Sequence, residues 1–352
     1  MLYNRLIDMQ KNNIFTRWSL FALFGILGLS ISCKQNKKDL NLKYVDMVES
    51  IEKLATKRCL PADIYMLKKQ YGRVFDVWFS EIMDYNRYKM YPDSIVADYF
   101  NYWIQTNKPM FKALDAHYKI HTQWKEDLNL AWSNLQSEIP STPTPVVYGY
   151  FSQFSNYNTF VDSSNGQLIL GFSKEMFMND TFPLYEMLEV PEFYARYNSP
   201  SQIPTMLIWN YLKSKYEADH QLKTMIDQAV FEGKMWSLIQ SVQPEQEIYD
   251  LLGYSKQEWN MMTLDQGQIW RHLLETKNLF SSDFNSYKRY FIYGNRTFGA
   301  GIPPECPPMI GSFIGYQIVQ AYLKESGRNY TDLFKEHDAS KILRISGYNP
   351  VK

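Results

Sequence analysis

The chain has 352 residues, of which 37 are basic and 37 acidic, and its hydrophobic fraction is 45%. This length allows one large globular unit or two small ones, at about 100–200 residues per domain. The balanced charge gives no electrostatic reason to expect a nucleic acid or an anionic membrane surface as a partner. Aromatic residues make up 16% of the chain, led by 27 tyrosines, and the simplest interpretation is an aromatic-rich core.

The N-terminus has the pattern of a bacterial secretion signal. Basic residues precede the uncharged run "SLFALFGILGLSIS" (19–32), and Cys33 follows at once. The run is shorter than the roughly 20 residues that a helix needs to span a bilayer, but it has the length of a signal-peptide core. Ser30 and Ser32 are small, as a signal peptidase requires of the backbone that enters its cleft. The arrangement resembles a bacterial lipoprotein box.

We therefore expect cleavage before Cys33, lipid on its thiol, a signal peptide at 1–32 and a flexible tether at 33–43. An uncleaved anchor helix and an ordinary secretory signal are the alternatives. The lipid would hold the chain in a membrane of the cell envelope. The residues after the cysteine, "KQNKK", are basic and amide-rich. Because they contain no acidic export tag, they favour the side of the membrane that faces the periplasm.

Two cysteines, Cys59 and Cys306, would remain as thiols. In an oxidising envelope compartment these two could pair and close a long loop. The sequence does not show that they meet, so the disulfide stays an open alternative.

A helical region is predicted from 44 to 139. Apolar residues recur at helical intervals in four stretches, at 44–55, 60–84, 94–105 and 125–139. The following segment, "PSTPTP" (140–145), ends this region because each proline removes a backbone donor and fixes the backbone.

Three strands are predicted next, at 146–151, 158–162 and 167–172, with a turn at "SSNG" between the last two. From 203 onward the pattern is helical again, with breaks at "GYS" (253–255) and "PPECPP" (303–308). The predicted fold class is α+β and mostly α, with a small antiparallel sheet and long helices. We expect an N-terminal helical region at 44–139 and an α+β domain at 140–352.

The stretch "HYKIH" places His117 and His121 four apart, which on a helix is the spacing of a zinc-binding pair. A catalytic zinc takes three protein ligands and keeps a fourth position for water. The working peptidase motif also has a glutamate beside the first histidine, as the base that activates this water. Here Tyr118 occupies that position, and a phenol does not take a proton from water near neutral pH. We interpret the two histidines as half-exposed residues of an ordinary helix.

A later helix carries a carboxyl group on an apolar face. In "QLKTMIDQAVFEGKMW", the residues Met225, Ala229, Glu232 and Trp236 share a face through spacings of four, three and four. Burying an unpaired carboxylate is costly, so Glu232 needs a hydrogen-bond donor, a cation or its own proton. The alternative is that Glu232 is solvated in the C-terminal half of the helix.

Three glycines predict close contacts between helices. Gly233 lies inside the helix that carries Glu232, where glycine costs about 1 kcal/mol relative to alanine, so a neighbouring element is expected to approach there. Gly311 and Gly315 fall one turn apart in "PPMIGSFIGYQIVQAYLKE" and would let that helix press on another.

The order of these elements resembles the core of a gluzincin-type zinc peptidase, in which a strand hairpin is followed by one helix and then by a second helix that carries "EG". In that family the first helix bears His-Glu-x-x-His and the second supplies a glutamate as third zinc ligand, roughly twenty residues after the first histidine. Counting back from Glu232 reaches Ile208, Trp209 and Leu212, none of which can bind zinc or act as a base. We interpret these four residues as a vestigial site, and we expect no catalytic residue, no metal and no cofactor.

Five segments of the C-terminal half occur in the order seen in the gliding-motility lipoprotein GldB family, which is similar to a group of predicted zinc peptidases. They are "FEGKMWSL", "DLLGYSKQEW", "GQIWRHLLETKNLFSSD", "CPPMIGSFIGYQIVQAYLKE" and "ILRISGYNP". The resemblance runs from about 140 to 350 and implies a zincin-like α+β domain with an added helical part. It implies an envelope lipoprotein associated with gliding motility and type IX secretion. Because the peptidase motif does not carry over, the resemblance does not imply hydrolysis.

Three functions remain as hypotheses. The leading one is a non-catalytic envelope protein, anchored by lipid on Cys33, whose ancestral peptidase cleft serves as a scaffold or binds an envelope protein partner. The second is a zinc hydrolase with the unusual ligands His117, His121 and Glu232, which would have to lie within about 4 Å of a common point. The third is a lipoprotein that presents tyrosine and tryptophan side chains to a glycan or peptide.

Overall fold

A computed structural model describes residues 40–351, apart from 87, 156–157, 191, 293–296, 298–301 and 303–305, and for 192–193 it describes the backbone alone. Residues 40–352 gather into one compact unit. The predicted signal peptide, the predicted lipidation site Cys33 and the tether up to residue 39 lie outside the described residues.

The sheet has four strands in the order β1-β2-β4-β3. Strands β1 (Lys43–Asp46), β2 (Val146–Tyr150) and β4 (Gln167–Ser173) run parallel, and β3 (Thr159–Ser164) pairs antiparallel with β4 at one edge. The three predicted strands are confirmed, and the predicted turn narrows to Asn165 and Gly166, both left-handed at φ of 50° and 77°, because Ser163 and Ser164 belong to β3.

The predicted antiparallel sheet is wrong, because the sheet is mixed. After β2 the chain crosses to the outer position, forms β3 and returns as β4 beside β2, so β2 and β4 run in the same direction. The prediction of a helix at 44–46 is also wrong, since these residues form part of β1 along β2. The helix starts only at Met47, where the Asp46 side chain accepts a hydrogen bond from the backbone N–H of Glu49.

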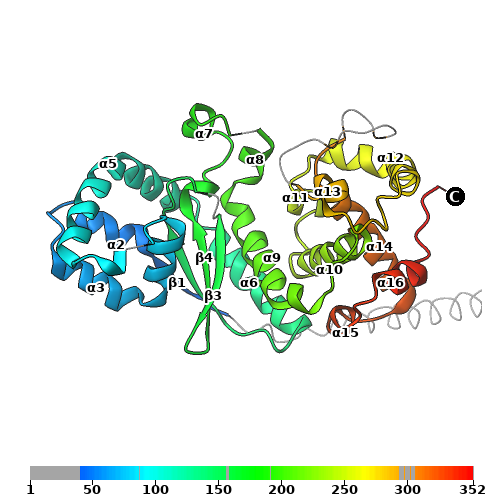
Figure 1. Ribbon diagram of the computed structural model, residues 1–352, viewed down its shortest axis with the longest axis horizontal. Coiled ribbons are helices and arrows are strands. Elements are labelled where there is room, and N and C mark those ends of the chain that lie inside the picture. Colours follow the sequence, from blue (N-terminus) through cyan, green and yellow to red (C-terminus); the bar gives the residue numbers. More distant parts are fainter. Residues whose placement is uncertain are drawn as a thin grey trace, which may run out of the picture. The chain divides into compact units, whose positions relative to one another are not determined.

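The other N-terminal helices cover the predicted segments, although the helix predicted at 94–105 continues to Ile120. They are α2 (Met47–Leu54), α3 (Pro61–Tyr71), α4 (Arg73–Asp76), η1 (Val77–Ile82), η2 (Tyr88–Met90), α5 (Asp93–Ile120) and α6 (Trp124–Glu138). The proline-rich segment at 140–145 is not helical, as its prolines predict. In Figure 1, α2, α3 and α5 lie on one side of the sheet, and α6 and α9 lie on the other.

Helices also dominate the chain after β4. They are η3 (Lys174–Phe177), α7 (Pro183–Met187), α8 (Glu192–Tyr197), η4 (Pro200–Gln202), α9 (Ile203–Tyr216), η5 (Glu217–Asp219), α10 (Met225–Val242), α11 (Ile248–Leu251), α12 (Lys256–Glu275), α13 (Phe284–Tyr287), η6 (Lys288–Tyr290), α14 (Ile310–Ser326), α15 (Tyr330–Lys335) and α16 (Ala339–Ser346). The class is therefore α+β with a large helical majority. In the part of the chain that the structure describes, no helix combines the length and the apolarity needed to cross a bilayer.

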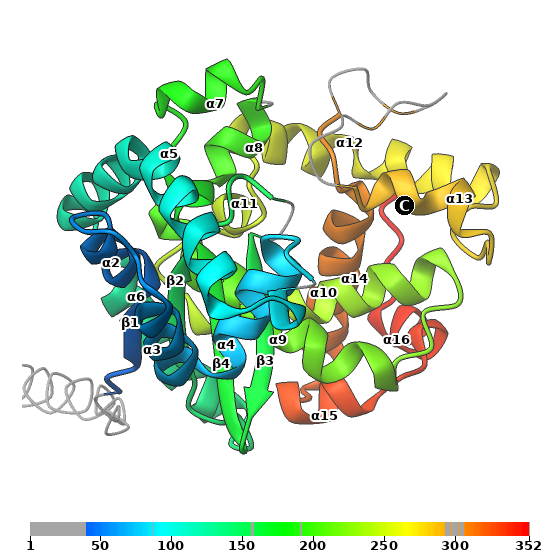
Figure 2. The ribbon, with the colours of Figure 1, turned by 60° about the vertical axis from the view of Figure 1, so that its left-hand side comes forward.

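The two faces of the sheet belong to two hydrophobic cores, because alternate side chains of a strand point to opposite faces. On β4, Leu170 and Phe172 pack into the core shared with α6, α9, α10 and α14, whereas Ile169 packs into the core formed by α2 to α5. Figure 2 shows α9, α10 and α14 as neighbours beyond the sheet. The sheet thus supports α9, and α9 and α14 flank α10, which carries Glu232.

Candidate functional site

Helices α10 and α14 approach each other at glycines. A Cβ atom on Gly233 of α10 would lie 2.2 Å from the backbone oxygen of Gly315, and one on Gly315 of α14 would lie 1.7 Å from the backbone oxygen of Ala229. No side chain fits at either position. One turn earlier, a Cβ on Gly311 would lie 2.4 Å from the ring of Phe291. The close contacts predicted from these glycines are confirmed.

This approach of the two backbones sets the polar environment of Glu232. The Ser312 hydroxyl on α14 donates to Glu232 Oε2, and Gln228 Nε2, one turn away on α10, donates to Oε1 over 3.3 Å. Glu232 is only 8% exposed, so it is not solvated. Of the three expected ways to offset the burial of this carboxyl group, a hydrogen-bond donor, a cation or its own proton, the structure shows hydrogen-bond donors.

Burial raises the pKa of Glu232 to about 7, since a charged carboxylate loses its hydration there. The hydrogen bonds from Ser312 and Gln228 and the charge of Lys213 oppose this rise, whereas Glu217 adds to it. Near neutral pH the carboxyl group therefore exists in both its protonated and its ionised form.

A cavity of about 300 Å³ lies beside Glu232, and we call it the Glu232 cavity. It is lined by Asn158, Tyr194, Tyr197, Asn198, Met206, Trp209, Lys213, Gln228, Glu232, Trp236, Phe291 and Met309. These residues come from α8, α9 and α10, from the positions just before β3 and just after α8, and from the segment between η6 and α14. The lining is mainly aromatic and apolar, with three amides, one ammonium group and one carboxyl group, which is the composition of a small-molecule or peptide-side-chain site.

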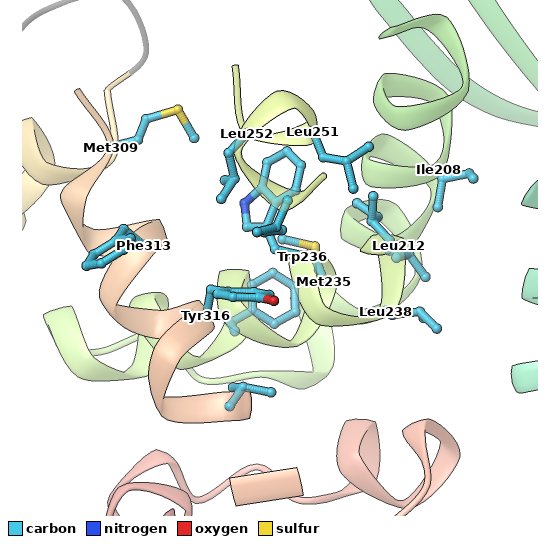
Figure 3. Close-up of a cluster of buried hydrophobic side chains, with 14 of the residues drawn as sticks. Ile208, Leu212, Met235, Trp236, Leu238, Leu251, Leu252, Met309, Phe313 and Tyr316 are labelled. Carbon is cyan, nitrogen blue, oxygen red and sulfur yellow. The ribbon is translucent and has the colours of Figure 1, made fainter. Parts of the chain in front are cut away.

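Two of the residues predicted for the vestigial site line this cavity, and two do not. Trp209 and Glu232 are among its lining residues. Ile208 and Leu212 are fully buried and do not line the cavity, and Figure 3 shows both in the buried cluster that also contains Trp236. The residue of α9 that reaches the cavity one turn after Trp209 is Lys213, whose Nζ lies 5.1 Å from the centre of the Trp209 ring.

Sequence reasoning missed Lys213 and Met206. Both could have been found from the spacing of Met206, Trp209 and Lys213, which places the three on one helical face by steps of three and four. The cavity therefore presents an indole and an ammonium group from α9 to the carboxyl group from α10. Neither an indole nor an ammonium group can bind a zinc ion.

Two tryptophans form one wall of the Glu232 cavity. The ring centres of Trp209 and Trp236 are 6.5 Å apart, and their planes are inclined by 36°. Both indole nitrogens are buried and have no hydrogen-bond partner, and the same holds for Nδ2 of Asn198. Because these three nitrogens have almost no solvent-accessible surface, they do not face the open volume of the cavity.

The histidine pair belongs to another part of the fold. His117 and His121 lie at the C-terminal end of α5, with ring centres 4.2 Å apart. Burial, and then the neighbouring His121, lower the pKa of His117 to about 4. No group of three or more His, Cys, Asp or Glu side chains within the described ranges is placed to hold a metal ion. The hypothesis of a zinc site made of His117, His121 and Glu232 is therefore wrong.

Cys59 and Cys306 are unpaired and buried. Cys59 belongs to the core of α2 to α5, and Cys306 belongs to the core on the opposite face of the sheet. The disulfide that the sequence left open is not formed, and the two thiols lie in different hydrophobic cores.

Comparison with known proteins identifies the family. The model of the family described as gliding motility protein GldB matches residues 33–350, which is most of the chain. Comparisons with curated proteins and with solved structures returned no match. The chain therefore belongs to the family of the gliding motility protein GldB, an assignment that indicates an envelope lipoprotein connected with gliding motility.

Proposed function

We propose that the chain is a non-catalytic component of the bacterial envelope, anchored through lipid on Cys33 and facing the periplasm, which binds a protein partner at the Glu232 cavity. The family match starts at Cys33, as expected of a mature lipoprotein whose signal peptide has been removed. On this proposal the core descends from a gluzincin-type peptidase and now serves gliding motility or type IX secretion as a scaffold.

One observation carries the proposal, namely the chemistry of the Glu232 cavity. A peptidase of the gluzincin type needs two imidazoles and a glutamate on the first helix, opposite the glutamate of the second. Here α9 contributes Met206, Trp209 and Lys213 to the cavity that contains Glu232. These groups supply apolar surface, ring faces and a positive charge, which suit binding rather than activation of water.

The proposal is tested first by metal analysis and peptidase assays on the purified full chain. We expect less than stoichiometric zinc after dialysis and no peptide cleavage that depends on Glu232. Stoichiometric zinc that survives dialysis, or cleavage that is lost in the variant E232Q, would return hydrolysis as the leading function.

A second test addresses binding in the cell. A photo-reactive amino acid in place of Met206, which lines the cavity, should cross-link to a defined envelope protein. The matched control carries the same group at Leu264 on α12, which is 84% exposed and lies outside the cavity. The variant W209A should lose both the cross-link and the cell's gliding or secretion phenotype. An equal cross-link from both positions, or full function of W209A, would argue against a binding role of the cavity.

A further inference from the structure

Each charged group that lines the Glu232 cavity already has a partner. Glu232 accepts hydrogen bonds from Ser312 at Oε2 and from Gln228 at Oε1. Lys213 Nζ lies 3.6 Å from Glu217 Oε1, so the cation of the cavity is paired with a carboxylate. A charged ligand would therefore leave water for a cavity that holds no unpaired group of the opposite sign.

Both signs of charge on a ligand are disfavoured by groups already in place. Lys213 Nζ lies 5.1 Å from the centre of the Trp209 ring, within the range of a cation–π contact, so the ring face that could attract a cation is occupied. The charge of Lys213 also acts on the Glu232 carboxyl group, since it opposes the rise of that group's pKa. A second ammonium group would meet the like charge of Lys213, and an anion would meet the ionised form of Glu232.

The surface that remains for a ligand is mainly carbon. It is formed by side chains that share an apolar or aromatic body, namely those of Tyr194, Tyr197, Met206, Trp209, Trp236, Phe291 and Met309. The indole nitrogens of both tryptophans have almost no accessible surface, so these two residues offer a ligand the carbon atoms of their rings. Such a lining stabilises an apolar group by removing it from water, and rings add offset or edge-to-face contacts with another ring.

The size of the cavity suits one large side chain. Its volume is about 300 Å³. An apolar cavity of about 150 Å³ is large enough to bind benzene. The Glu232 cavity therefore has room for a ring with a substituent, or for a fused pair of rings, but not for an extended stretch of polypeptide.

From these properties we propose that the Glu232 cavity binds an uncharged aromatic side chain, that of a phenylalanine, tyrosine or tryptophan, which the protein partner inserts between α9 and α10. The inference rests on the proposed function, since it names the group that the partner presents. The ring would pack against Trp209 and Trp236 and displace water from the cavity. An aromatic side chain suits this role because it brings a large apolar area at a low cost in conformational entropy.

The test is calorimetric titration of the full chain in detergent with N-acetylated amino-acid amides. The aromatic probes are N-acetyl-tryptophanamide and N-acetyl-phenylalaninamide. N-acetyl-leucinamide is neutral and aliphatic, N-acetyl-lysinamide carries a cation, and N-acetyl-aspartic acid α-amide carries an anion. We expect an aromatic probe to bind at least about tenfold more tightly than either charged probe, and more tightly than the leucine probe. Equal or tighter binding of a charged probe or of the leucine probe, or no binding of any probe, would overturn the proposal.

Two variants locate the binding in the cavity. The variant M206W places an indole in the cavity and should abolish the binding of the aromatic probes. The matched control is M187W, because Met187 on α7 is 78% exposed and does not line the cavity. Equal losses in the two variants would overturn the assignment to this cavity. The comparison of probes on the parent chain remains decisive even if M206W does not fold.

The variant E232Q separates binding by apolar surface from binding by charge. It removes the ionised form of the carboxyl group and should not weaken the aromatic probes. A loss of about tenfold or more in E232Q would show that the carboxyl group holds the ligand, and it would overturn the proposal.

Competition connects the probes with the protein partner. N-acetyl-tryptophanamide should suppress the cross-link from the photo-reactive group at position 206, and N-acetyl-lysinamide at the same concentration should not. A cross-link that persists at a saturating concentration of the aromatic probe would overturn the insertion of an aromatic side chain and leave the proposed function standing. Tight binding of the aromatic probe without any cross-link would overturn the protein partner and assign the cavity to small aromatic molecules.

Discussion

Gly315 on α14 lies so close to Ala229 on α10 that a Cβ atom on the glycine would be 1.7 Å from the alanine's backbone oxygen. These two helices form the centre of the larger core, and their contact brings Ser312 to Glu232. The close approach at Gly315 therefore holds together the two helices that carry Ser312 and Glu232.

The variant G315A should destabilise the fold by about 3 kcal/mol or more, because the added methyl group forces two backbones apart. The measurement is denaturant unfolding followed by circular dichroism. The matched variant G311A lies one turn earlier on α14, where the added atom meets the side-chain ring of Phe291 rather than backbone. A ring can shift, so the loss of stability should be smaller. Equal losses in the two variants would contradict the assignment of the close contact to Gly315.

Glu232 should make the chain less stable as the pH rises. Its pKa is about 7 in the folded chain against 4.5 in the unfolded chain, so the folded state holds the proton more tightly. Stability from this group is complete below pH 4.5 and falls by about 3 kcal/mol as the pH rises to 7. The variant E232Q cannot ionise, so its stability relative to the parent should increase by about this amount between pH 4.5 and 7.5. A constant difference across this range would contradict the raised pKa.

His220 should make the chain less stable as the pH falls, which is the opposite of the effect of Glu232. Its Nε2 lies 3.0 Å from Lys234 Nζ and its Nδ1 lies 2.8 Å from the Tyr216 backbone oxygen. Burial, and then the charge of Lys234, lower its pKa from 6.5 to about 4. A neutral His220 therefore stabilises the fold above pH 6.5, and about 3 kcal/mol of this is lost as the pH falls to 4.

The variant H220N tests this dependence by unfolding at a series of pH values. It should be less stable than the parent at pH 7, and the difference should shrink as the pH falls from 6.5 to 4. The variant H117N should also lose part of the acid sensitivity, since burial also lowers the pKa of His117. If H220N retained the full acid sensitivity of the parent, the effect would belong to another group.

Glu175 should be essential for the segment that leads into β3. This carboxyl group is fully buried, and its Oε1 accepts hydrogen bonds from the Ser152 backbone, the Ser152 hydroxyl and the Phe154 backbone, at 2.7, 2.7 and 3.1 Å. The variant E175A removes all three and leaves buried donors, so we expect a loss of about 3–5 kcal/mol. E175Q keeps an acceptor and should lose less. The replacement of the exposed Glu126 by alanine is the control, and a similar loss there would contradict the prediction.

Local patterns identified much of the fold. The strands at 146–151, 158–162 and 167–172 were predictable because β-branched and aromatic residues cluster there between turn residues. The contacts at Gly233 and Gly315 were predictable because a glycine inside a helix has a cost that only a close neighbour offsets. Both signals lie within a few residues of the feature that they predict.

The vestigial site shows where such reasoning stops. A count back from Glu232 reached Ile208 and Leu212. A helix turns by about 100° per residue, so an error of one position selects a side chain that points into the core instead of one that lines the cavity. In the structure the residues of α9 that line the cavity together with Glu232 are Met206, Trp209 and Lys213. Trp209 was among the residues predicted for the vestigial site because the predicted residues of α9 lie on more than one face of the helix.

The sequence by itself determined the α+β class, the two strands of the hairpin β3–β4 and the close contacts at the glycines. It also showed that no histidine lies between 122 and 219. Only the tertiary structure decided that β1 joins the sheet, that the sheet is mixed, and that Lys213 shares a cavity with Glu232. The physical reason is the range of the forces involved. Propensity and periodicity act between neighbours in the chain, whereas strand pairing and the facing of helices depend on residues that are far apart in sequence and meet only in the folded core.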